Sequence, residues 1–516
     1  MAISQYVSLN DHLIADDPLG REAATVDFGS YCFDNDPCSA FVHRCSHSVR
    51  NHMLASTDSS NVLDCDRSWH RRSHPESRRW RFIPVICWAQ LLHFYQPPTQ
   101  LPSVLEKICQ ESYRPLLDVF LQYPTAKATV NINAILTEML RDHGHSDIIQ
   151  RLVKLAKRGQ IEFTGSGKYH PILPLIPADE AKRQIELNLK TNSYFFGGAY
   201  KPVGFFPPEM AYGRSIVPPV CDSGHRWILL SGVACPNSWP TDRIPYVQEG
   251  DKRLMVFFRD DIWSNKISFQ DVGPNDFLGH LRSLARGKGK QYIVTAMDAE
   301  TYGHHIQNWE RLFLADVYEQ LEVRKETYEG IQQRKALAAQ QSSLFEVTEA
   351  TREIETVTIS QLLELFPAGE SIDPKASSWS TTNEDIEAGN PYPLWKDKDN
   401  ELHRLQWEHL GIAMQTCSAA AQVADNDESR RFAGIARGLL DRALHSCQFW
   451  WASNRPMWDI NLIHMGLLDH WRVIVNAYRA INNSGASDEI KTEFYYKAVV
   501  ARDIRNKIAD SLFATH

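Results

Sequence analysis

Three polar residues follow apolar runs that should form buried strands. His93, Glu209 and Asp298 each stand at or just beyond the end of such a run. The three runs are Val85–Leu92, Val203–Phe206 and Tyr292–Ala296. In parallel β/α folds the reactive groups lie at the carboxyl ends of the strands. These three residues are therefore the first candidates for an active site.

Two of these residues, Glu209 and Asp298, are carboxylates, and a pair of carboxylates can break a glycosidic bond. That reaction needs one ionised carboxylate as nucleophile and one protonated carboxyl group as acid. Burial and neighbouring charge would separate the pKa values of the two groups. Structural roles compete with this interpretation, because Asp298 could cap a helix and His93 could be a hydrogen-bonded histidine beside a proline turn.

The three runs belong to a longer alternation of strand and helix patterns between residues 85 and 321. Further strands are predicted at Ala128–Ile132, Ile161–Thr164, Trp227–Leu230 and Leu254–Phe258. Helices are predicted between them, most clearly at Asp147–Lys157 and Asp179–Phe196, where apolar residues recur at helical spacing. Such alternation favours a parallel sheet with helices outside, and a stretch of roughly 240 residues can form one β/α barrel.

The other parts of the chain differ in composition. Residues 1–80 are rich in Ser, Asp, His and Arg and show no sustained hydrophobic period, which predicts a poorly ordered N-terminal extension. Residues 81–322 should form the catalytic β/α barrel, and residues 323–375 a helical linker or insert. From 376 to 516 most apolar residues recur at helical spacing, which predicts a C-terminal helical bundle.

Composition restricts the partners and the compartment. The 516-residue chain has a formal net charge of -8, so we expect no nucleic-acid partner, because phosphate contacts require a basic surface. It has no run approaching the roughly 20 apolar residues of a membrane span and no secretory signal pattern, so we expect no membrane association. The 10 cysteines form no Cys-x-x-Cys pair, which favours reduced thiols and a cytoplasmic protein.

Several segments together resemble the motifs of glycoside hydrolase family 57, the α-amylase, 4-α-glucanotransferase and branching-enzyme group. They occur in the family's order, at Leu92–Pro98, Lys157–Pro174, Phe206–Glu209, Phe258–Asp261, Met297–His304, Ser378–Thr381, Gly389–Trp395 and Cys447–Ser453. In the first segment Phe94 and Tyr95 separate His93 from Gln96, whereas the family has a contiguous His-Gln-Pro. In the Met297–His304 segment Ala299 stands where the family often has glycine.

This resemblance implies an α/β fold, with an incomplete (β/α)7 barrel followed by a C-terminal helical bundle. It implies a retaining glycosidase or transglycosidase that acts on an α-glucan or maltooligosaccharide and needs no cofactor and no metal. Glu209 would be the nucleophile and Asp298 the general acid/base. The candidate substrate-binding residues are His93, Gln96, His170, Arg259, Glu300, His304, Trp379, Trp450 and Trp451.

Two other functions compete with this prediction. A metal-dependent carbohydrate hydrolase or deacetylase on a related barrel could gather His93, Asp298, His304 and His305 around a metal, although the chain has no His-Glu-x-x-His motif. A glucan-binding protein without activity would keep the aromatic residues and lose a carboxylate, so the presence of both Glu209 and Asp298 favours an enzyme. The sequence does not separate hydrolysis, glucan transfer and branching, and it leaves the oligomeric state open.

Overall fold

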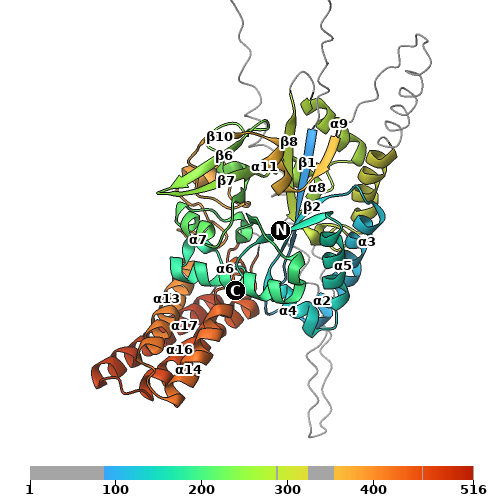
Figure 1. Cartoon of the computed structure of the whole chain (residues 1–516). Coiled ribbons are helices and arrows are strands. Elements are labelled where there is room, and N and C mark those ends of the chain that lie inside the picture. The colour runs from blue at the N-terminus through green and yellow to red at the C-terminus, as the bar shows by residue number, and fades with distance from the viewer. Residues whose placement is uncertain (1–85, 286–288, 324–353, 456, 515–516) are drawn as a thin grey trace, which may run out of the picture.

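A computed structural model describes residues 86–285, 289–323, 354–455 and 457–514 of the chain. The predicted N-terminal extension, residues 1–80, lies outside these described residues. Figure 1 shows a curled sheet with helices against it, and a separate group of long helices from the C-terminal part of the chain.

Seven parallel strands of the sheet form an open barrel, in the order β8-β1-β2-β3-β4-β5-β7. Their bounds are β1 Ile86–Phe94, β2 Ala128–Ile132, β3 Ile161–Gly165, β4 Gly204–Phe205, β5 Trp227–Leu230, β7 Lys252–Phe258 and β8 Gln291–Asp298. Within the described residues β7 and β8 do not pair as a ladder, so the barrel is incomplete. The predicted α/β class and incomplete (β/α)7 barrel are confirmed.

The central strand β1 explains how the sheet holds the candidate residues. All nine of its residues, from Ile86 to Phe94, are buried, as expected for a parallel strand covered on both faces. Its register places His93 beside Asn131 of β2 on one side and beside Asp298 of β8 on the other. The end of this strand therefore brings polar residues from three strands together.

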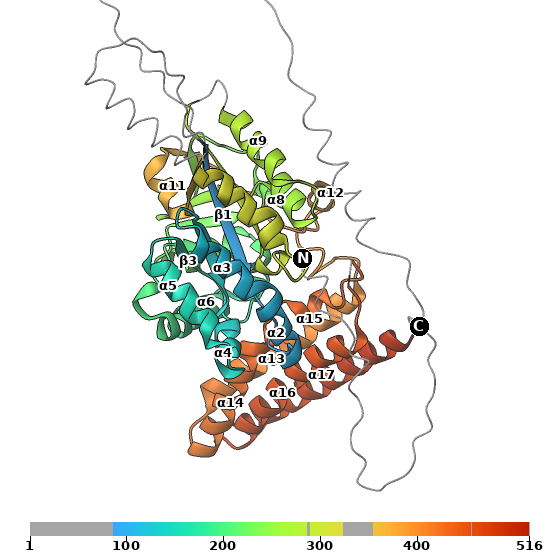
Figure 2. The same cartoon turned by 90° about the vertical axis from the view of Figure 1, so that its right-hand side faces the viewer.

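Helices follow most strands and cover the sheet. Figure 2 shows α3, α5 and α6 side by side along one side of the barrel. The helices of the barrel region are α2 Pro102–Ile108, α3 Arg114–Gln122, α4 Ala134–Asp142, α5 Ser146–Lys157, α6 Ala178–Phe196, α7 Val217–Asp222, α8 Asp261–Ser268 and α9 Pro274–Ala285. In α5 the residues Ile148, Leu152 and Leu155 are fully buried, which agrees with the apolar spacing read from the sequence.

Three further strands extend the sheet beyond the predicted set. β6 (Ile244–Glu249) pairs antiparallel with β7, and its Pro245 hides the strand pattern in the sequence. β9 (Ile354–Val357) pairs with β1, and β10 (Ala368–Ser371) pairs with β6, with α11 (Ile359–Leu365) between them. The described part of the 323–375 segment thus contains two short strands beside the helix α11. β9 pairs with the first half of β1, before the residues that pair with β2, and β10 extends the sheet at β6.

The C-terminal part is a bundle of long helices reached through an extended segment. Residues 376–400 contain only the short helix α12 (Asn383–Glu387). The bundle consists of α13 Glu401–Val423, α14 Asp427–Ala443, the short α15 Cys447–Trp450, α16 Ile460–Asn482 and α17 Asp488–Ala514. Both views place it below the barrel in the pictures, with α14 and α16 side by side. A helical C-terminal region is thus confirmed, while the predicted domain boundaries stay predictions.

His225, just before β5, is a buried histidine whose ring nitrogens have no hydrogen-bond partner among the described residues. Its ring centroid lies 5.2 Å from that of Phe205, and a Cβ added at Gly165 would meet the ring at 2.3 Å, so the site is tightly filled. Burial lowers the pKa of His225 to about 4. The folded protein therefore keeps this ring neutral over a range in which an unfolded chain would protonate it.

We predict that His225→Phe stabilises the protein and flattens its pH dependence. An apolar ring of similar shape removes a buried unsatisfied group, which should raise the free energy of unfolding by about 1–2 kcal/mol at pH 7. In the wild type, this histidine's contribution is intact above pH 6.5 and is lost by about 1.4 kcal/mol per pH unit as the pH falls towards 4. Urea unfolding followed by tryptophan fluorescence at pH 7 and pH 5 measures both effects. The exposed His143→Gln is the control, and a variant as pH-sensitive as the wild type contradicts the prediction.

Candidate active site

Glu209 follows the very short strand β4, in a turn that begins with Pro207 and Pro208. The two prolines lack backbone N–H groups and end the strand, and Glu209 itself has a left-handed backbone with φ 57°. A non-glycine residue in this region is held there by its surroundings. The Trp379 indole Nε1–H donates to Glu209 Oε2 at 2.7 Å, and the Trp379 backbone N–H donates to the Glu209 carbonyl at 3.1 Å.

Asp298 is the last residue of β8 and is only half-buried, in contrast to the seven buried residues before it. It lies beside His93 in the register of β1 and β8. Its negative charge acts on two other carboxyl groups, those of Glu209 and Glu300. The structure therefore brings the two predicted carboxylates into one electrostatic environment at the same end of the barrel.

The pKa of Glu209 is raised to about 7, first by burial and second by the negative charge of Asp298, while the Trp379 N–H opposes the rise. The side chain still keeps 16% of its exposure, so a molecule arriving from solvent can reach it. Two interacting carboxyl groups titrate as a pair, so the first proton that binds is shared between them and cannot be assigned to one residue alone. Near neutral pH such a pair can hold one proton, and the acid and nucleophile roles require that this proton lie on Asp298 when a substrate is bound.

His93 and His170 form a stacked pair of buried imidazoles beside these carboxylates. Their Nε2 atoms lie 3.2 Å apart and their ring centroids 5.1 Å apart. His93 Nδ1 lies 2.7 Å from Asn131 Oδ1, and His170 Nδ1 lies 3.8 Å from Glu209 Oε1. Burial lowers the pKa of both histidines, so both rings are neutral at pH 7. Neutral rings can donate or accept one hydrogen bond at each nitrogen, but they bring no charge to the site.

Gln96 and Glu300 lie behind the pair and contact each other. Gln96 Nε2 donates to Glu300 Oε1 at 2.8 Å, and the Tyr113 hydroxyl donates to the same oxygen. Both side chains are buried, and the pKa of Glu300 is raised to about 8 by burial and then by the charge of Asp298. This arrangement ties the loop that follows Asp298 to the end of β1, and the sugar contacts predicted for Gln96 and Glu300 stay predictions.

Arg259, at the end of β7, is buried and fully engaged by protein groups. Its Nε donates to the Ala296 carbonyl, and its two terminal nitrogens donate to Asp261 and Asn265, all at 2.8 Å. The neighbouring Asp260 caps α8 by accepting from the Trp263 backbone N–H. Arg259 therefore ties the ends of β7 and β8 together.

The remaining predicted contacts are His304 and the tryptophans. His304 Nδ1 lies 2.6 Å from Glu111 Oε2. Burial lowers the pKa of the neighbouring His305 to about 4, and the charge of Asp298 opposes this shift. Trp450 and Trp451 are 8% and 0% exposed, so Trp451 has no ring face open to a sugar. Trp379 is the one of the three predicted tryptophans that contacts a candidate carboxylate, and it does so through its N–H.

Four contacting residues were missed in the sequence. The Tyr95 ring stacks on His170 at 3.9 Å between centroids, and Phe206 stacks on His93 at 4.8 Å. Asn131 follows the same strand-end rule as the predicted residues and could have been found by it. Ser446 gives no signal, because it reaches His170 from the bundle, 276 residues further along the chain.

Within the described residues, no group of three or more His, Cys, Asp and Glu side chains is arranged to hold a metal ion. In the same part of the chain, no helix has both the length and the apolar character needed to cross a membrane.

Comparison with known sequences identifies relatives over the barrel. The family model described as glycosyl hydrolase family 57 matches residues 79–363. An α-amylase of Pyrococcus horikoshii is 26% identical over 251 residues, which are 46% of this chain and 38% of the amylase. A 4-α-glucanotransferase of Thermococcus kodakarensis is 27% identical over 222 residues, which are 41% of this chain and 32% of that protein. The aligned regions thus cover only about a third of these curated relatives.

Solved structures show the same fold at low sequence identity. The 4-α-glucanotransferase of Thermococcus litoralis superimposes with a TM-score of 0.57 and 18% identity, over 78% of this chain and 60% of that chain. A branching enzyme of Pyrococcus horikoshii gives a TM-score of 0.58 and 15% identity, over 81% of this chain and 94% of the other. The family model covers more than half of the chain and includes both candidate carboxylates, and the same barrel is found in its solved structures. The chain is therefore a member of glycosyl hydrolase family 57.

Proposed function

We propose that the protein is a retaining glycosidase or transglycosidase of α-glucans, with Glu209 as nucleophile and Asp298 as general acid/base. The observation that carries this proposal is the placement of two carboxyl groups at strand ends of one barrel, where burial and then the charge of Asp298 raise the pKa of Glu209 to about 7. The α-amylase and 4-α-glucanotransferase names of its relatives support the substrate class.

In the first half of the reaction the Glu209 carboxylate attacks the anomeric carbon. The bond from that carbon to the glycosidic oxygen breaks, and Asp298 gives its proton to the departing oxygen. A covalent glycosyl ester on Glu209 and an ionised Asp298 result. The Trp379 N–H on Oε2 holds the carboxylate plane fixed during this attack.

In the second half Asp298 removes a proton from water or from a sugar hydroxyl. That oxygen bonds to the anomeric carbon from the face that the first sugar left, and Glu209 departs as a carboxylate. Two inversions at one carbon retain the anomeric configuration. Water as acceptor gives hydrolysis, and a sugar hydroxyl gives transfer.

Product analysis tests this function directly. The purified full chain is incubated with amylose and, separately, with maltotriose, and the products are separated by size and linkage. Shorter oligomers with new reducing ends indicate hydrolysis, longer α-1,4 oligomers from maltotriose indicate transfer, and new α-1,6 linkages indicate branching. Absence of any product from either substrate would contradict the proposal.

Trp379→Phe should lower activity and move the acid limb of the pH profile to higher pH. The indole N–H stabilises the ionised form of Glu209, so its loss raises the pKa of that carboxyl group further. A lost hydrogen bond to a charged group predicts a fall in kcat of about 10- to 100-fold. The pH dependence of kcat/KM on maltooligosaccharides measures the shift, because it reports the free enzyme.

The matched control for this variant is Trp407→Phe. The Trp407 indole N–H donates to the Trp395 carbonyl at 2.8 Å, so this change also removes one indole hydrogen bond, but it does so away from the carboxylates. The control should keep the wild-type pH profile. An unshifted acid limb in Trp379→Phe would show that this N–H does not set the ionisation of Glu209.

A further inference from the structure

Ser446 connects the bundle to the candidate active site. It lies in the turn between α14 and α15 and is 1% exposed. Its Oγ is 2.9 Å from His170 Nδ1, and its backbone N–H donates to the His170 carbonyl at 3.1 Å. His170 is fully buried and has a left-handed backbone with φ 60°. One bundle residue thus holds both the main chain and the ring of a histidine that lies 3.8 Å from Glu209.

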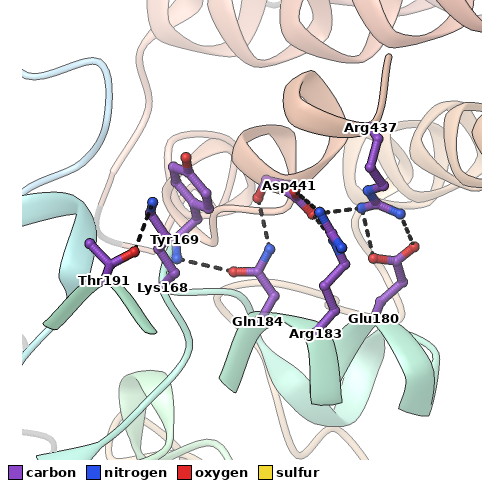
Figure 3. Close-up of polar contacts among 8 residues, drawn as sticks. All are labelled: Lys168, Tyr169, Glu180, Arg183, Gln184, Thr191, Arg437 and Asp441. Atoms are coloured by element: carbon purple, nitrogen blue, oxygen red, sulfur yellow. Dashed lines mark hydrogen bonds and ion pairs between the residues drawn. The ribbon is translucent and has the colours of Figure 1, made fainter. Parts of the chain in front are cut away.

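A network of ion pairs fixes the helix that carries this turn. Figure 3 shows Arg437 and Asp441 of α14 facing Glu180 and Arg183 of α6. Arg437 Nη1 lies 2.7 Å from Glu180 Oε1, and Arg183 Nη2 lies 2.7 Å from Asp441 Oδ2. Asp441 is 5% exposed and bonds Arg437 as well, at 2.9 Å, so its charge is paired twice. This network sets the position of α14 five residues before Ser446.

The same network holds the segment that precedes His170. Gln184 of α6 donates from Nε2 to the Asp441 carbonyl at 2.9 Å, and its Oε1 accepts from the Tyr169 backbone N–H at 3.1 Å (Figure 3). The Lys168 backbone N–H donates to the Gln184 carbonyl at 3.1 Å. His170 is therefore placed between two fixed elements, α6 on one side and the α14–α15 turn on the other.

Hydrogen-bond chemistry then determines the protonation of each ring nitrogen. Asn131 donates from Nδ2 to Thr164 Oγ1 at 2.9 Å, so its Oδ1 faces His93 and must accept. His93 accordingly carries its proton on Nδ1, and as a neutral ring it has a bare Nε2. His170 must then donate from Nε2 across the 3.2 Å contact, which leaves its own Nδ1 bare and able to accept from the Ser446 hydroxyl.

We propose that Ser446 is a positioning residue that fixes the neutral Nε2–H tautomer of His170, and so keeps that histidine from sharing a proton with Glu209. This inference rests on the proposed function, because Glu209 is the group whose ionisation it protects. The Ser446 hydroxyl occupies the only nitrogen of His170 that lies near Glu209 Oε1. The bundle thereby sets the charge state of a barrel site through one hydroxyl group.

Other groups around His170 favour the same neutral state. His93 from β1 and His445 from the α14–α15 turn both lower the pKa of His170, in addition to burial. The Tyr95 ring covers its face, and Cys447 lies 3.3 Å from the Tyr95 hydroxyl. Glu209 is the acidic group in contact range of His170, and Asp298 acts on His93. Loss of the Ser446 hydroxyl would leave Nδ1 free to carry the ring's one proton and to donate it to Glu209 Oε1.

The test compares Ser446→Ala with Ser446→Thr in the full chain. In the alanine variant we expect the single proton of the neutral His170 ring to move to Nδ1, where it can donate to Glu209 Oε1, so that the pKa of Glu209 falls and the acid limb of kcat/KM moves to lower pH. We expect kcat on maltooligosaccharides to fall about tenfold with little change in KM, as for the loss of one hydrogen bond. The threonine variant keeps the hydroxyl and should restore the wild-type limb. Ser484→Ala is the control, because its Oγ donates to the Ile481 carbonyl in the bundle, away from His170.

A second measurement separates this inference from the proposed function. Nuclear magnetic resonance of protein labelled with 15N at histidine, assigned with His170→Gln, shows which of the two ring nitrogens carries the proton. A proton on Nε2 in the wild type and in Ser446→Thr, with a proton on Nδ1 in Ser446→Ala at pH 7, supports the inference even if no glucan is turned over. An identical His170 spectrum in all three proteins overturns it, as does an unchanged pH limb in an active Ser446→Ala enzyme.

Discussion

Replacing Glu209 by glutamine should lower kcat on amylose by on the order of 10⁴-fold or more, with little change in substrate affinity. An amide is a poor nucleophile, so the glycosyl ester does not form, while the amide oxygen still accepts from the Trp379 N–H. Initial rates of reducing-end release measure the loss. Circular dichroism and thermal unfolding should remain close to those of the wild type, because the two side chains have the same shape.

Glu310→Gln is the matched control for this variant. Glu310 is another buried carboxyl group whose pKa is raised by burial, and it lies in a helical turn, Glu310–Ala315, away from β4. Its replacement should leave kcat close to the wild-type value. Equal losses in both variants would indicate a general effect of removing buried carboxyl groups and would remove Glu209 from the reaction.

The stereochemistry of rescue by azide gives a stricter test of the same role. In Glu209→Ala, azide can occupy the space of the missing carboxylate and attack the anomeric carbon directly, which inverts the configuration. From an α-glucan substrate the product should therefore be a β-glycosyl azide. Formation of only the α-glycosyl azide would place the nucleophile at another residue.

Asp298→Asn should lower kcat on maltooligosaccharides by about 10²- to 10⁴-fold, the usual contribution of general acid/base catalysis. The loss should be much smaller for the first step with an aryl α-maltoside, because a phenolate leaves without needing a proton. Burst kinetics of phenol release, followed by slow turnover, would show an intermediate that forms but is hydrolysed slowly. Equal losses with natural and aryl substrates would contradict the role of Asp298 as the acid.

The same variant should also change the ionisation of its partner. The negative charge of Asp298 is the second cause of the raised pKa of Glu209, after burial. Without that charge the pKa of Glu209 should fall below about 7, so the acid limb of kcat/KM should move to lower pH. This shift is opposite in sign to the one expected for Trp379→Phe, so the pair of variants separates charge repulsion from hydrogen bonding.

Much of the barrel could be predicted because each strand carries its own local pattern. The runs ending at His93, Glu209 and Asp298 became β1, β4 and β8, and parallel topology placed their ends together. The strands β6, β9 and β10 were missed because they are short or contain proline, and because they pair with backbone that the barrel strands leave free, either at a sheet edge or in the first half of β1. A local pattern does not show which edges will be free.

The contacts within the site could be predicted less well. The sequence predicted sugar contacts for His304 and Trp451, whereas His304 Nδ1 lies 2.6 Å from Glu111 Oε2 and the Trp451 ring is fully buried. Adjacent residues after a strand point in different directions, and the turn that decides between them depends on its packing. Likewise, helical spacing shows that a tryptophan lies on the apolar face of a helix, but it does not show whether the ring faces the site or the bundle interior.

The sequence by itself determined the strand-end carboxylates, the parallel barrel and the helical C-terminal region, because these depend on local hydrophobic period and on strand direction. Only the tertiary structure decided that Trp379 donates to Glu209, that Arg259 ties two strand ends, and that Ser446 reaches His170. Those contacts join residues up to 276 positions apart. The Ser446 contact follows from how α14 docks on α6, and all three contacts depend on packed surfaces that leave no periodic signal in the chain.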